Sequence, residues 1–97
     1  MKNYLHHEVL GETQVEELVA LGLDFSTSLY DLESILMILP SQLIVEGYTF
    51  DLVIGPGLLM YFDWNQGRTL VEIKNNSLLE AAFEMLKWSL INNHIKK

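Results

Sequence analysis

The chain has 97 residues, a formal net charge of −7 and no cysteine. This length predicts one domain with a single hydrophobic core. The lack of cysteine excludes disulfides and cysteine-ligated zinc, and the acidic balance argues against direct binding to a nucleic-acid backbone.

The first eleven residues show no hydrophobic period, and we interpret residues 1–11 as a loosely held arm of a single domain that spans residues 1–97. This segment lacks the apolar run of a signal peptide, and the longest apolar stretches of the chain are too short to cross a bilayer. We therefore expect a cytoplasmic protein that does not contact a membrane.

Two short helices are predicted before Pro40. The first begins at Thr13, where Thr13 and Glu16 match the capping-box pattern T-x-x-E, and it ends at Gly22. The second is capped by Ser28, carries leucine and isoleucine at helical spacing, and ends before the proline.

The next segment is rich in β-branched and aromatic side chains, with glycines where turns are expected. The predicted strands are Gln42–Val45, Tyr48–Ile54, Leu58–Trp64 and Arg68–Lys74. Because the loops between them are short, consecutive strands must pair antiparallel as a meander.

Turn lengths determine which side chains share the face that packs on the helices. A two-residue turn at Glu46-Gly47 would pair Val45 with Tyr48, and a three-residue loop at Gly55–Gly57 would pair Ile54 with Leu58. The last strand joins this pattern only if the loop after Trp64 has an even number of residues, which we predict. The expected core face carries Phe50, Leu52, Met60, Phe62, Thr69, Val71 and Ile73. The expected opposite face carries Thr49, Asp51, Val53, Leu59, Tyr61, Asp63, Leu70 and Glu72.

A third helix is predicted from the capping box of Ser77 and Glu80 to about Asn92. One apolar stripe of this helix contains Leu79, Ala82, Phe83, Leu86 and Leu90. A second stripe, on nearly the opposite side, contains Leu78, Ala81, Met85 and Trp88. A helix that is apolar on two sides must bury both, against the sheet and against the N-terminal helices or a second subunit. The predicted fold is α+β in the order α-α-β-β-β-β-α, a four-stranded antiparallel meander with helices packed on one face.

Chemistry-bearing residues are few. His6, His7 and His94 are metal-ligand types, but neighbours on an arm rarely converge on one ion, so we predict no metal site and no cofactor. Asp63, Trp64 and Arg68 gather three kinds of binding group at one hairpin tip and form a candidate binding site. No catalytic residues are predicted, and the protein is expected not to be an enzyme. A small hydrolase or transferase that uses Asp63 and a histidine is an alternative.

Four segments carry a family resemblance. They read T-Q-V-E-E-L-V-A-L-G-L-D, L-M-I-L-P, L-I-V-E-G-Y-T-F-D-L-V-I and S-L-L-E-A-A-F-E-M-L-K-W-S-L-I-N-N-H. Together they resemble small uncharacterised proteins of phage-like and mobile elements from gut bacteria, over most of the chain from Thr13 onward. The shared features are packing and capping patterns, so the resemblance implies an accessory or host-interaction protein and assigns no functional residue.

Two apolar surfaces without an obvious cover predict binding to another protein, with a homodimer as one form of this binding. The candidate interface residues are Trp88, Met85, Leu78, Tyr61, Leu59 and Leu70. The alternative is an acidic decoy for a basic, nucleic-acid-binding protein. Its candidate residues are Asp51, Asp63, Glu46 and Glu72. Salt separates the two hypotheses, since apolar association persists at high ionic strength whereas an electrostatic complex dissociates.

Overall fold

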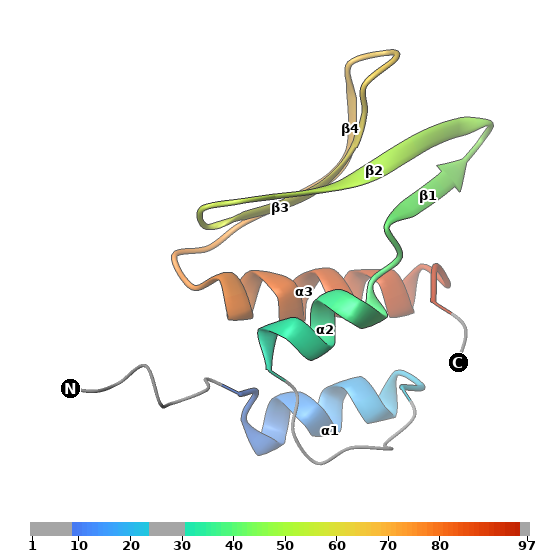
Figure 1. The fold of residues 1–97 in the computed structure, drawn as a ribbon. Coiled ribbons are helices and arrows are strands. Elements are labelled where there is room, and N and C mark those ends of the chain that lie inside the picture. The colour runs from blue at the N-terminus through green and yellow to red at the C-terminus, as the bar shows by residue number, and fades with distance from the viewer. Residues whose placement is uncertain (1–8, 24–30, 96–97) are drawn as a thin grey trace.

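A computed structural model describes residues 9–23 and 31–95, which form three helices and four strands (Figure 1). The helices are α1 (Glu12–Ala20), α2 (Leu32–Ile38) and α3 (Leu78–Ile91). The strands are β1 (Gln42–Val45), β2 (Tyr48–Gly55), β3 (Leu58–Asp63) and β4 (Arg68–Lys74). They form one antiparallel sheet in the order β1-β2-β3-β4. The predicted α+β fold and element order are therefore confirmed.

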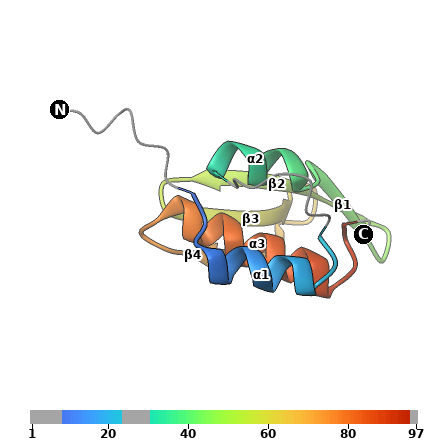
Figure 2. The ribbon, with the colours of Figure 1, turned by 90° about the horizontal axis from the view of Figure 1, so that it is seen from below.

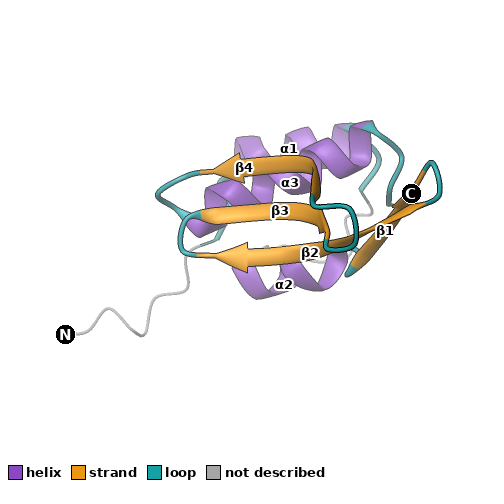
Figure 3. Ribbon diagram, turned by 90° about the horizontal axis from the view of Figure 1, so that it is seen from above, coloured by secondary structure: helices purple, strands orange, loops and turns teal. Residues whose placement is uncertain are grey.

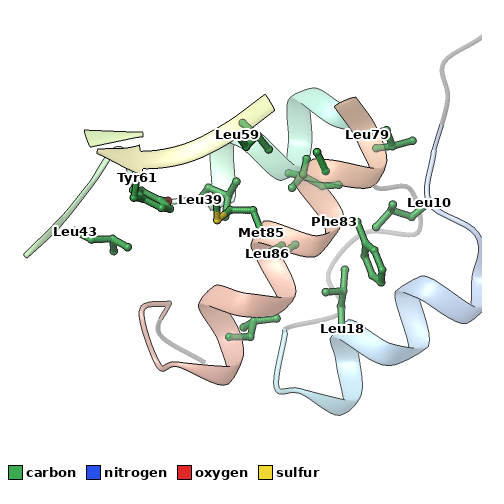
Figure 4. Close-up of a cluster of buried hydrophobic side chains, with 14 of the residues drawn as sticks. Leu10, Leu18, Leu39, Leu43, Leu59, Tyr61, Leu79, Phe83, Met85 and Leu86 are labelled. Carbon is green, nitrogen blue, oxygen red and sulfur yellow. The ribbon is translucent and has the colours of Figure 1, made fainter. Parts of the chain in front are cut away.

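All three helices lie on one side of the sheet, with α3 between the sheet and α1 and with α2 beside it (Figures 1 and 2). α3 contacts β3 and β4 as well as α1 and α2. In Figure 4, Met85 points toward Leu39 and Tyr61, whereas Phe83 points the other way, toward Leu10 and Leu18. The chain thus buries both stripes of α3 within itself, which is why this helix is apolar on two sides.

The ends of α1 show one correction and one confirmation. Its N-cap is Gly11, whose N–H donates to Oε1 of Gln14 at 2.9 Å, and not Thr13, which is exposed. Gly22 ends the helix with a φ of 109°, and the N–H of Leu23 bonds back to a carbonyl of the last turn. This reversal is the predicted C-terminal glycine motif.

The caps of the other two helices are short acceptor side chains. Asp31 accepts the N–H of Ser34 at 2.9 Å and begins α2, while the predicted cap Ser28 lies outside the described residues. Ser77 accepts the N–H of Glu80 at 3.2 Å and begins α3, as predicted. Each cap satisfies a backbone donor that the first helical turn leaves free.

The first hairpin has the predicted register, but the second is shifted by one residue. Val45 pairs with Tyr48 across the Glu46-Gly47 turn. The next turn is Pro56-Gly57 alone, so Gly55 pairs with Leu58. Side chains alternate between faces, and this shift therefore reverses the predicted orientation of every residue in β3.

Gly57 explains the shorter turn. Its φ is +64°, which favours glycine, and a Cβ added there would lie 2.8 Å from the backbone O of Asn75. The N–H of Asn75 donates to the O of Gly57 at 2.9 Å. The turn is thus held against the connection between β4 and α3.

The third hairpin has a four-residue turn, 64–67, so the residue count is even as predicted, but Trp64 belongs to the turn and not to the end of the strand. A bulge follows, because Val71 pairs with Tyr61 and Thr69 with Phe62, which leaves Leu70 as the extra residue. Val71 and Ile73 face the core as predicted, whereas Thr69 lies on the opposite face. Leu70, predicted on the opposite face, is partly buried and packs against the core.

Candidate interaction surface

One face of the sheet has no helix over it. In Figure 3, β2, β3 and β4 lie in front of all three helices, and the turn between β3 and β4 loops in front of one end of the sheet. The strand pairing places the side chains of Val53, Leu58, Met60 and Phe62 on this side, which we call the open face. All four are partly exposed. Asp51, Thr69, Glu72 and Lys74 share the open face as its polar members.

The β3–β4 turn adds an aromatic projection at one end of the open face. Trp64 is 64% exposed, and its ring meets the ring of Phe62 edge-on at a centroid distance of 4.7 Å. This geometry is favourable for aromatic pairs. An exposed indole on a short turn is typical of residues that dominate protein interfaces.

Asp63 anchors this turn and is not a surface group. Its side chain is 2% exposed, and its Oδ1 accepts the N–H of Asn65 at 2.9 Å and of Gln66 at 3.3 Å. The guanidinium of Arg68 lies over the ring of Tyr48 at 4.4 Å. Of the three residues predicted for a binding site at this tip, Trp64 and Arg68 are exposed and Asp63 is buried.

The predicted interface residues of β3 lie in the core instead. Leu59 and Tyr61 have no exposed surface, so the expectation that they form an interface on the opposite face is wrong. The cause is the two-residue turn at Pro56-Gly57. The hydroxyl of Tyr61 donates to the backbone O of Pro40 at 2.7 Å, and burial raises the pKa of Tyr61 to about 12. Tyr61 is therefore a structural link between the sheet and the end of α2.

The second stripe of α3 is also covered by the chain itself. Met85 is fully buried, so it is not available to a partner. Leu78 and Trp88 are partly buried and pack against the core. The Trp88 ring stacks on Tyr61 at 6.2 Å and lies 4.9 Å from the His94 ring. The open face therefore replaces this stripe as the candidate surface.

Acidic groups are concentrated on the helical side of the molecule. The exposed acidic residues of the three helices are Glu12, Glu16, Glu17, Glu33 and Glu84. Within the described ranges 9–23 and 31–95, Lys87 is the one basic residue of these helices, and its Nζ pairs with Glu17 at 3.0 Å. The four residues predicted for an acidic decoy do not form a comparable surface, because Asp63 is buried and Asp51 accepts a hydrogen bond from Gln42 at 2.9 Å.

In the described part of the chain, no three histidine, cysteine, aspartate or glutamate side chains lie close enough to share an ion. His6 and His7 lie outside the described residues. Among the described helices, none combines the length and the apolar character needed to cross a bilayer.

Sequence reasoning missed Leu58, Met60 and Phe62 as surface residues. The signal that could have identified them is the dipeptide Pro56-Gly57, which suits the two central positions of a tight turn. With that turn, the alternation of β3 follows directly. Comparison of the chain with protein-family models, with curated proteins and with solved structures gives no match.

Proposed function

We propose that this chain is a non-catalytic protein-binding module that engages its partner with the open face. The observation that carries the proposal is the one-sided fold, in which three helices cover one face of the sheet and leave Val53, Leu58, Met60 and Phe62 at the surface. Contiguous exposed apolar patches of several hundred Å² often mark interaction sites.

The roles of the polar side chains support a non-catalytic function. Asp63 holds a turn, Asp31 and Ser77 cap helices, and Tyr61 bonds a backbone carbonyl. The ring of His94 lies 4.9 Å from the ring of Trp88 and is not paired with Asp63. The hydrolase alternative would need Asp63 to pair with His94 or with His7, which lies outside the described residues. An accessory role in the cytoplasm, in line with the resemblance to proteins of mobile elements, is part of the proposal.

Site-specific photo-cross-linking in the native host tests the proposal. A photoreactive amino acid replaces Met60, in the middle of the open face, or Glu84, an exposed residue of α3, as the matched control. We expect protein adducts from position 60 that are reduced by a further Phe62→Asp substitution, and few from position 84. Equal capture from both positions, or no adduct from position 60, would contradict the proposal.

The acidic decoy remains a second candidate because the helical side carries exposed acidic residues with a single basic neighbour among the described residues. It assigns the contact to the helices and not to the open face. In a lysate of the host, adducts from position 84 that form at low salt and disappear at high salt would favour this alternative, because screening weakens exposed charge pairs.

A further inference from the structure

We propose that the partner of the open face is a second copy of this chain. The two copies pack through their open faces about a two-fold axis. This axis lies between the two faces, runs across the strands and passes over β4 between Glu72 and Lys74. This inference rests on the proposed function and adds the identity of the partner.

The charges of the open face are self-complementary. Glu72 and Lys74 are two residues apart on β4, so their exposed side chains, which carry opposite charges, project from the same face. Among the described residues, neither Glu72 nor Lys74 has an ion-pair partner. A two-fold axis between them sets each Lys74 opposite the Glu72 of the second copy, and the symmetry forms this pair twice. The acidic helical side would instead repel a second copy.

The same axis superimposes apolar side chains on β3. Met60 pairs with Glu72, and Leu58 pairs with Lys74, so the axis also passes between Met60 and Leu58. Each Met60 then lies on the Leu58 of the other copy. Sheets that pack through their faces keep their strand directions within about 30° of each other, which this arrangement satisfies.

The two ends of the open face differ in shape. At one end, Phe62 and Trp64 form the aromatic projection. At the other end is an open hollow of about 670 Å³. The residues that line it are Pro56, Gly57, Leu58, Lys74, Asn75 and Asn76. Phe62 and the Pro56-Gly57 turn each lie about three residues, or roughly 10 Å, from the axis along the strand. The two-fold operation therefore brings the projection of each copy to the hollow of the other.

The edges of the sheet are poorer sites for a second copy. β4 carries Arg68, Glu72 and Lys74 and contains the bulge, and charged side chains and bulges disfavour pairing between edge strands. β1, the other edge, has only four residues. The open face is therefore a better site for a second copy than either edge of the sheet.

The size of the open face predicts a weak dimer. Three strands at a spacing of about 4.8 Å make the face roughly 15 Å wide, and about seven residues per strand at about 3.3 Å each make it roughly 23 Å long. The area is therefore about 350 Å² per copy. A stable interface of standard size buries about 800 Å² per partner. We therefore expect a dissociation constant of about 10 μM or weaker.

Sedimentation equilibrium of the full chain, from about 5 μM to 1 mM, tests the inference. The wild-type chain is expected to shift from monomer to dimer over this range and to keep much of the dimer at high salt. Met60→Asp should abolish the dimer. Glu72→Lys or Lys74→Glu alone should weaken it about 3- to 20-fold at low salt, because two charge pairs are lost per dimer. The double reversal should restore it. Glu16→Lys on α1, which changes the net charge as much as Glu72→Lys, is the control and should not weaken it.

The outcomes separate this inference from the proposed function. A wild-type chain that stays monomeric at 1 mM, while position 60 cross-links to a different protein, would refute the dimer and leave the binding module standing. A dimer that the double reversal does not restore would refute the two-fold register. A chain that gives no protein adduct from position 60, its own copies included, would refute both proposals.

Discussion

Tyr61→Phe removes one hydroxyl from a side chain without exposed surface. In the wild-type chain, this hydroxyl donates to the backbone O of Pro40 at 2.7 Å. The variant leaves that partly buried carbonyl without this donor, and such a loss costs about 1–2 kcal/mol. At pH 7 we therefore expect the free energy of unfolding to fall by this amount.

At high pH the order of stabilities should reverse. Burial raises the pKa of Tyr61 from 10.0 to about 12, so folding favours the neutral phenol. The stability that comes from this preference is fully present below pH 10 and is lost as the pH rises toward 12. A shift of two units corresponds to about 2–3 kcal/mol. Phenylalanine does not titrate, so the variant should become the more stable chain above a crossover pH that lies between about 10.7 and 11.6.

Urea unfolding of both chains at 25 °C, followed by circular dichroism from pH 7 to 11.6, measures this difference. Other groups titrate equally in both chains and cancel in the subtraction. Tyr48→Phe, at a partly buried tyrosine, controls for the loss of a tyrosine hydroxyl. If the stability difference between wild type and Tyr61→Phe stays constant over this pH range, the reasoning from the buried phenol is wrong.

Two further substitutions test the packing. Gly57→Ala should lower the free energy of unfolding by about 2–4 kcal/mol, because the new Cβ would meet both a positive φ and a clash with the backbone of Asn75. Gly47 also has a positive φ but has open space around it, so Gly47→Ala should lower the free energy of unfolding by only about 1–2 kcal/mol. Equal losses in urea unfolding would argue against the close approach. Ser89→Ala should raise stability by about 1 kcal/mol, because the buried hydroxyl of Ser89 has no hydrogen-bond partner. A lower midpoint of thermal unfolding would show that this hydroxyl is stabilising.

The features that could be predicted from the sequence are those set by local chemistry. The cap at Ser77 and the glycine stop at Gly22 depend on residues within one or two turns of the helix, and both are confirmed. The need of α3 for cover on two sides also followed from its own spacing. Which elements provide the cover depends on long-range packing, so the spacing within α3 does not distinguish the N-terminal helices from a second subunit.

The register of β2 and β3 shows why the candidate surface was only partly predictable. Gly55-Pro56-Gly57 contains two glycines, so its local chemistry allows either a two-residue or a three-residue connection. The choice depends on the approach of Gly57 to Asn75, a contact between segments that are distant in the chain. The difference of one residue moved Tyr61 from the expected surface to the core and moved Met60 the other way. The exposed Trp64, at a turn, could be predicted because it does not depend on this register.

The central position of α3 has a consequence for folding during synthesis. α1 is attached to α3 through Gln14 with Glu80 and through Glu17 with Lys87, pairs that are about 70 residues apart. When α1, α2 and the whole meander have been synthesised, α3, the segment on which they pack, has not yet emerged from the ribosome. The apolar sides of α1, α2 and the meander therefore stay exposed to water or bound to a chaperone until residue 91 has emerged. The domain should consequently fold late and in one cooperative step. Long-range contacts of this kind also slow folding.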